Sequence, residues 1–252
     1  NFATHPVSQT GAMCSISADY PGRTRSVVEQ LTSATCLFLQ GACGNINPDR
    51  MENDYEPARS LGTRLGCEVV RVWETIKTAN IASVYSLARV EALPAYRYNS
   101  PEDAEKLVED LTAELSRFDG EHAENSAVIW TKTRLERALT AVESWRQERP
   151  MDSIMAEFQA IRIGDLAVAG APGEIFTEIG REVRKRSPMG HTFFSGYAND
   201  SIGYVPVPEA YEEGGYEVTH ACRVDQQASE ILIRVCRELL LEVGDEKSDS
   251  RG

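Results

Sequence analysis

The sequence predicts an α/β protein that has a mixed β-sheet, helices around it and a charged helical hairpin at about residues 101–147. Short apolar runs, which are typical of strands, alternate along the chain with longer segments whose apolar residues recur at helical spacing. Gly164-Asp165 separates two of the apolar runs, and a Gly-containing pair in that position favours a β-hairpin. Two periodic and highly charged segments account for the helical hairpin.

The first part of the chain contributes a strand end, two helices and two strands. Asn1–Thr4 resembles the end of a strand, which His5-Pro6 stops because the residue before proline is held extended. Asp19 and Pro21 are residues that favour a helix start. The nearly continuous apolar run at 35–40 predicts a strand buried on both faces. The remaining predicted elements here are a helix at 57–77 and a strand at 81–95.

The second part begins with the charged hairpin, whose helices at 101–118 and 124–147 are joined near Asp119-Gly120. Its charge pattern is that of a solvated arm or scaffold. The elements predicted after it are strands at 154–163 and 166–169, a helix at 174–186, a strand at 191–197 and a helix at 224–243.

Composition sets the broad class of the protein. A length of 252 residues is enough for a substantial core, and we expect one α/β domain over residues 1–243 with a charged, disordered tail at 244–252. The formal net charge of -13 repels phosphate backbones, which excludes nucleic acid as a partner. The sequence contains no apolar run near the roughly 20 residues that span a bilayer. None of the six cysteines forms a C-x-x-C pair.

The stretch from Gly164 to Tyr216 delivers polar side chains at the ends of two predicted strands, which is how α/β proteins build sites. Glu174 follows the first strand through a Pro-Gly turn. As a residue at a helix start it is either a carboxylate favoured by the helix dipole or a metal ligand or general base. His5 is either a structural histidine or a metal ligand. The four tyrosines after the second strand are packing residues or donors to a metal or oxyanion: Tyr197, Tyr204, Tyr211 and Tyr216.

Several well-known catalytic motifs are absent from the sequence. It contains no G-x-S-x-G elbow, no phosphate-binding G-x-x-x-x-G-K-[ST] loop and no H-E-x-x-H zinc motif. The glycine-rich loop at 41–48 exposes backbone amides, but the helix that an anion site requires is not indicated directly after it.

Six short motifs, in order along the chain, resemble the N-terminal catalytic domain of the neutral/alkaline, non-lysosomal ceramidases, and especially their shorter bacterial relatives. The matching stretches are Phe2-Ala-Thr-His5-Pro6, Ile16–Gly22, Phe38–Pro48, Pro172-Gly-Glu174, Gly196–Asn199 continuing through Ile202-Gly-Tyr204, and Glu209–Tyr216.

The resemblance implies a zinc-dependent amidohydrolase of sphingolipid metabolism that cleaves the N-acyl bond of ceramide, or of a related lipid or small-molecule amide. Two histidines, one glutamate and one tyrosine hold the zinc in that family. His5 falls on the second histidine, Glu174 on the glutamate and Tyr204 on the tyrosine. Tyr216 falls on a second tyrosine near the substrate carbonyl. Such ligands would let Zn²⁺ activate a water molecule and polarise the amide carbonyl.

The sequence departs from that family at three places. Asn47 stands where ceramidases carry a serine in a G-[DN]-x-S-P loop; it cannot be a nucleophile, although its amide can hydrogen-bond a carbonyl or water. The first zinc histidine would lie before residue 1, and no C-terminal sandwich domain follows Val243. We therefore expect a short relative whose natural chain extends further toward the N-terminus.

Two alternative functions remain open at this stage. One is a catalytically inactive, binding relative that retains the ceramidase fold, and the other is a metal hydrolase that acts on an unrelated amide or ester. Neither location, beyond soluble or peripheral, nor oligomeric state can be read from the sequence.

Overall fold

The computed structural model describes residues 1–13, 15–78, 80, 83–118 and 126–245. The chain divides into two compact units. Unit 1 comprises residues 1–89, 157–201 and 232–252, and unit 2 comprises residues 90–156 and 202–231. Both units are therefore assembled from segments that are distant in sequence, and the prediction of a single domain over 1–243 stays a prediction.

Unit 1 is built on a mixed four-stranded sheet in the order β1-β2-β3-β5. β2 and β3 are antiparallel and joined at Gly164-Asp165, with Ile163 opposite Leu166, whereas β3 and β5 run parallel. Gly164 has a φ of +59°, which only glycine adopts readily, and this explains the tight turn. The strands are β1 (Val84–Leu93), β2 (Ile154–Ile163), β3 (Leu166–Gly170) and β5 (His191–Ser195), and residues 90–93 of β1 and 154–156 of β2 belong to unit 2.

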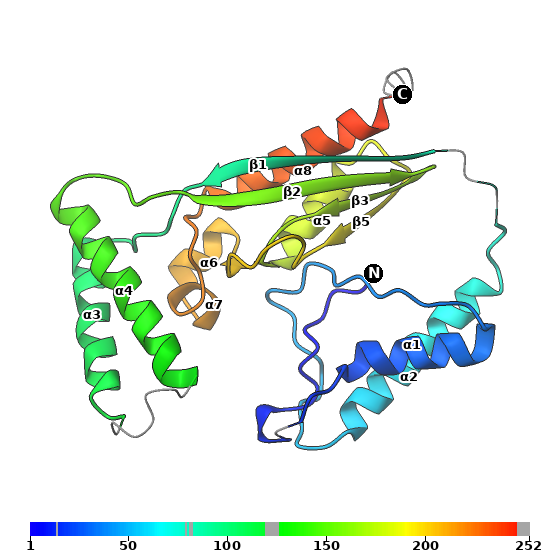
Figure 1. Cartoon of the computed structure of the whole chain (residues 1–252), viewed down its shortest axis with the longest axis horizontal. Coiled ribbons are helices and arrows are strands. Elements are labelled where there is room, and N and C mark those ends of the chain that lie inside the picture. The colour runs from blue at the N-terminus through cyan, green and yellow to red at the C-terminus, as the bar shows by residue number, and fades with distance from the viewer. Residues whose placement is uncertain (14, 79, 81–82, 119–125, 246–252) are drawn as a thin grey trace. The chain divides into compact units, whose positions relative to one another are not determined.

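Two helices accompany this sheet, and both lie behind it in the view of Figure 1. α5 (Thr177–Lys185) contacts β5, and its buried face includes Ile179 and Val183. α8 (Ala228–Gly244) is tied to the sheet by polar contacts, because Arg89 of β1 pairs with Glu238 and Glu242 of α8. Both helices contribute to the buried apolar core, α5 through Ile179 and Val183 and α8 through Leu239 and Leu240.

The N-terminal part of unit 1 contains a short 3-10 helix at Gly11–Met13 and two packed helices, α1 (Asp19–Thr32) and α2 (Glu56–Trp73). Glycines on α2 allow the close approach of α1. A Cβ atom at Gly62 would lie 2.5 Å from the Cβ of Arg23 and 2.6 Å from the Tyr20 carbonyl oxygen.

Unit 2 contains the charged helical hairpin, α3 (Pro101–Leu115) and α4 (Ser126–Arg146). Ser100 caps α3 by accepting a hydrogen bond from the Asp103 backbone N–H. One apolar cluster of the hairpin contains Ala104, Ala141 and Val142, with Trp145 packed against it, and Arg97 stacks over the Trp145 ring at 3.7 Å. Unit 2 also contains β6 (Tyr204–Val205), α6 (Pro208–Glu213) and α7 (Tyr216–Thr219).

The observed elements confirm the predicted fold class, a mixed sheet with helices and a charged hairpin. Three local predictions were wrong. Asn1–Thr4 is not the end of a strand, because Phe2 forms only an isolated bridge with Gln40. Residues 35–40 form no strand, because this extended segment pairs only through the isolated bridge between Phe2 and Gln40, and Leu37 is 82% exposed. Glu174 does not start a helix: it opens the two-residue strand β4 (Glu174–Ile175), and α5 begins at Thr177.

Most of the predicted tail lies outside the described residues, and Gly244 is the last residue of α8. Among the helices that the structure describes, none is both long and apolar enough to cross a membrane.

The α1–α2 contact gives a test of the fold. We expect Gly62→Val to lower the free energy of unfolding by about 1–3 kcal/mol, because a side chain there collides with the backbone of α1. Gly190→Val is the matched control, since a Cβ atom at Gly190 meets nothing within 4 Å and should change stability by less than about 0.5 kcal/mol. Urea denaturation measures both. Equal stability of the two variants would contradict the described packing.

Candidate functional site

His5 is held at the end of an extended segment in unit 1. Phe2 donates its backbone N–H to the Leu39 carbonyl, and the His5 N–H is bonded to the Ile46 carbonyl at 2.9 Å. The segment therefore runs alongside the glycine-rich loop at 41–48. His5 itself is only 8% exposed, so its imidazole is placed by packing as well as by the backbone.

Glu174 approaches His5 from a different part of unit 1. The turn that precedes β4 contains Gly173 at a φ of +90°, a conformation that L side chains rarely adopt. The Oε2 atom of Glu174 lies 3.6 Å from Nε2 of His5. Two of the three predicted metal ligands, which are far apart in sequence, are thus neighbours in the structure.

Tyr197, for which the sequence left open a packing role or a donor role, is a third member of this cluster. Its hydroxyl lies 3.1 Å from Nδ1 of His5 and donates to Oε2 of Glu174 at 3.1 Å. Tyr197 has a φ of +55°, a left-handed conformation that costs a residue with a side chain about 1–2 kcal/mol. Such strain is concentrated at functional sites. The available signal was the loop Gly196–Asn199 directly after an apolar strand.

Cys43 closes the inner side of the cluster. Its Sγ atom lies 3.8 Å from Nδ1 of His5 and 3.7 Å from the Tyr197 hydroxyl. Burial raises the pKa of the Cys43 thiol, so this residue stays in the neutral thiol form. Burial, followed by the neighbouring Cys43 and Glu174, raises the pKa of the Tyr197 phenol. Tyr197 is therefore a neutral hydroxyl that can donate a proton to a hydrogen bond.

The glycine-rich loop is docked on the start of α5. Gly44 donates its N–H to the Ile175 carbonyl, and a Cβ atom there would lie 2.5 Å from the Glu174 carbonyl oxygen. The Asn45 side chain accepts from the Thr177 N–H and donates to Glu178, which caps the helix from outside. Asn47 is exposed, one residue beyond the Ile46 carbonyl that binds His5.

The other two predicted site residues, Tyr204 and Tyr216, lie together in unit 2. Their rings meet edge to face with centroids 6.3 Å apart, and Tyr216 stacks on His220 at 5.4 Å. Tyr216 is 53% exposed, so its hydroxyl is accessible. Burial lowers the pKa of His220, which favours the neutral imidazole. The predicted residues therefore form two groups: His5, Glu174 and Asn47 belong to unit 1, and Tyr204 and Tyr216 to unit 2.

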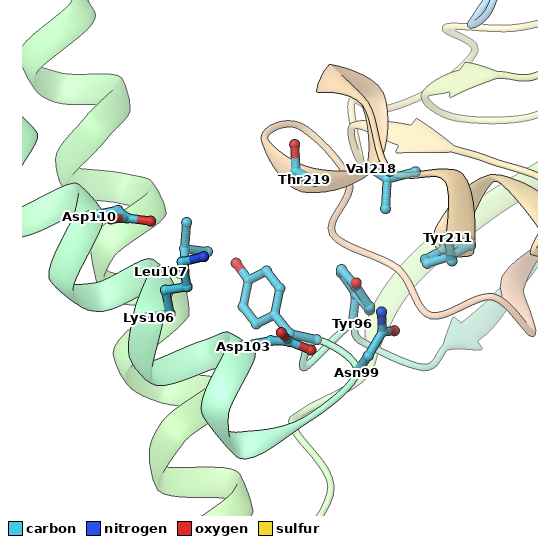
Figure 2. A pocket seen from close by; sticks show the side chains of 11 residues that line it. Tyr96, Asn99, Asp103, Lys106, Leu107, Asp110, Tyr211, Val218 and Thr219 are labelled. Atoms are coloured by element: carbon cyan, nitrogen blue, oxygen red, sulfur yellow. The ribbon is translucent and has the colours of Figure 1, made fainter.

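Unit 2 also has a cavity of about 320 Å³ between α3 and the α6–α7 segment (Figure 2). Tyr96, Tyr211 and Val218 are the buried part of its lining, and the charges on its rim come from exposed residues of α3. Of the candidate tyrosines only Tyr211 lines this cavity among the described residues, and none of the proposed metal ligands does. It is therefore a feature separate from the predicted chemistry.

The donor chemistry of the unit 1 cluster fits a zinc ion. An imidazole nitrogen and a carboxylate oxygen are both common zinc ligands at about 2.0–2.2 Å, which puts two tetrahedral ligand atoms roughly 3.3 Å apart. The 3.6 Å between His5 and Glu174 is close to that separation. Within the described ranges no group of three or more His, Cys, Asp or Glu side chains could hold a metal.

Known proteins resemble this chain in both sequence and fold. No protein-family model matches it. The neutral ceramidase of Pseudomonas aeruginosa is 22% identical over 261 aligned positions, which cover 86% of this chain and 39% of that protein. The crystal structure of that ceramidase superposes with a TM-score of 0.65 at 18% identity and covers 96% of this chain and 43% of the ceramidase chain.

A second solved structure, described as ceramidase complexed with C2, gives a TM-score of 0.67 at 17% identity. It covers 96% of this chain and 45% of its own. The chain thus spans less than half the length of the relatives it matches. These matches confirm the resemblance to neutral ceramidase and establish a shared fold.

The cap on α5 gives a test of how the site loop is held. Asn45→Ala should destabilise the protein by about 1 kcal/mol, because the Thr177 N–H loses its partner. Asn45→Asp retains an acceptor for the Thr177 N–H but places a second carboxylate beside Glu178. We therefore expect its loss of stability to lie between those of the wild type and Asn45→Ala. Thermal denaturation at matched concentration measures both. If Asn45→Ala has wild-type stability, the loop is not docked on α5 as described.

Proposed function

We propose that this chain carries the metal-binding part of a zinc-dependent amide hydrolase that acts on N-acyl amides, ceramide or a related acylated molecule. The adjacency of His5 and Glu174 in unit 1 supports it most directly. The two residues stand in separate ceramidase-like motifs that are far apart in the sequence, and His5 Nε2 and Glu174 Oε2 lie 3.6 Å apart. The similarity to neutral ceramidase supports the reaction class.

His5 and Glu174 are the residues that would hold the zinc ion, through an imidazole nitrogen and a carboxylate oxygen. Tyr204 stays a predicted ligand on the strength of its motif. A bound zinc ion would lower the pKa of a water molecule toward about 7 and polarise the scissile carbonyl. The low exposure of His5 and the bonds to Tyr197 keep these two side chains in place before substrate arrives.

The remaining side chains suggest direct attack by water rather than an acyl-enzyme route. Asn47 has no hydroxyl and cannot form a covalent ester with the acyl group, but its amide can donate a hydrogen bond to a carbonyl. The exposed phenol of Tyr216 can donate to an oxygen that gains negative charge in the transition state. In this proposal water supplies the hydroxyl of the product acid, and the amine leaves with a proton.

Metal binding is the first test. Wild-type protein purified without chelator should retain close to one zinc ion per chain, and His5→Ala and Glu174→Ala should each lose most of it, because two remaining ligands hold zinc weakly. His191→Ala and Glu157→Ala are matched controls, since both residues are exposed and lie outside the cluster. Elemental analysis after exhaustive dialysis gives the ratio. Unchanged zinc in both cluster variants would rule out the assignment.

Turnover is the second test, and it separates an enzyme from an inactive relative with the same fold. The longest available form of the protein should release fatty acid from a labelled N-acyl sphingosine or a simpler N-acyl amine. Activity should disappear with a zinc chelator and return when zinc is added. Absence of turnover on amides and esters by zinc-loaded protein would favour the inactive, binding relative instead.

A further inference from the structure

The hydroxyl of Tyr197 lies between the two proposed ligands of unit 1 and contacts both. It is 3.1 Å from Nδ1 of His5 and 3.1 Å from Oε2 of Glu174. A phenol has one proton to donate and lone pairs to accept with, whereas an ionised carboxylate can only accept. The Tyr197 hydroxyl therefore donates its hydrogen to the Glu174 carboxylate.

This hydrogen bond determines the tautomer of His5. Because the Tyr197 proton points to Glu174, the oxygen of Tyr197 can only accept from His5, so Nδ1 of His5 must carry the hydrogen. A neutral imidazole has one protonated nitrogen, and Nε2 then keeps its lone pair. Nε2 is also the nitrogen that lies 3.6 Å from Oε2 of Glu174. A single hydroxyl thus selects both the tautomer and the ligating atom.

We propose that Tyr197 is the positioning residue of the metal site: it holds His5 in the Nδ1–H tautomer and Glu174 in one orientation, so that Nε2 and the carboxylate face the same ion. Histidine ligands commonly donate their second ring N–H to an outer partner, and loss of such a partner typically weakens metal binding 10–100-fold. Here the same outer partner serves two ligands at once.

The backbone around Tyr197 is built to keep its hydroxyl in this place. The Tyr197 N–H is bonded to the Gly173 carbonyl at 3.0 Å, and the Gly196 N–H to the Gln40 carbonyl at 3.1 Å. The first bond joins Tyr197 to the turn that carries Glu174, and the second joins it to the segment beside His5. The residue is thus connected by main-chain bonds to both parts of the site.

The first experiment uses the metal-free protein and does not depend on the proposed function. In nitrogen-15 spectra of the imidazole side chains, recorded where histidine is neutral, the His5 signal should show a protonated Nδ1 and an unprotonated Nε2. His5→Ala identifies that signal among the four histidines of the chain. In Tyr197→Phe the His5 signal should move toward the Nε2–H tautomer. A wild-type His5 protonated on Nε2 overturns the proposal even if the variant does not fold.

The second experiment measures zinc affinity by competition with a chromophoric chelator, and it tests the role that rests on the proposed metal site. Tyr197→Phe should bind zinc about 10–100-fold more weakly than wild type. Its cobalt-substituted form should show a changed d–d absorption band. Tyr55→Phe is the matched control, because Tyr55 is exposed, lies outside the cluster and donates its hydroxyl hydrogen to Ser15 Oγ.

The outcomes distinguish the two levels of the proposal. If the wild-type protein binds no zinc, the proposed function is wrong, and the tautomer of His5 in the metal-free protein still tests the hydrogen-bonding role of Tyr197. Wild-type protein that binds zinc, with equal affinity and an identical cobalt spectrum in Tyr197→Phe, would overturn the positioning role while the metal site stands.

Discussion

The site in unit 1 depends on a close crossing of backbones that leaves no room for side chains. A Cβ atom at Gly44 would lie 2.5 Å from the Glu174 carbonyl oxygen, and one at Gly196 would lie 3.3 Å from the Gly41 carbonyl oxygen. These glycines let the glycine-rich loop, the turn before β4 and the loop after β5 come together. His5, Glu174 and Tyr197 meet because their backbones are brought to this crossing, and the side-chain hydrogen bonds then select their orientations.

The chemistry of the cluster follows from which groups keep their protons. Burial favours the uncharged forms of Cys43 and Tyr197. These two neighbours of His5 therefore do not offer a thiolate or a phenolate that would bind a metal ion. The carboxylate of Glu174 then supplies the negative charge of this cluster. A neutral imidazole and one carboxylate form a donor pair that suits zinc, with the thiol left as a packing residue rather than a ligand.

Much of the architecture could be predicted because it is encoded locally. Gly164-Asp165 specifies the β2–β3 turn, and the charged periodicity of 101–147 specifies the two helices of the hairpin. The run at 35–40 was mistaken for a buried strand because apolarity alone does not provide a pairing partner: only Gln40 finds one, in Phe2. Pairing is a long-range property, and the local pattern does not contain it.

The site could be predicted only in part, for a similar reason. His5 and Glu174 stand in recognisable motifs, so their residue types and sequence neighbours indicated that they are site residues. Tyr197 was one of four tyrosines in the same stretch, and its role depends on a left-handed backbone that tyrosine seldom adopts. Its importance becomes visible only when the distances to His5 and Glu174 are known.

The most direct test of the account is an anomalous-scattering map at the zinc absorption edge from crystals grown with zinc. We expect a peak about 2.0–2.2 Å from both Nε2 of His5 and a carboxylate oxygen of Glu174. A fully loaded crystal whose only peaks lie elsewhere, for example at His191 or His220, would contradict it.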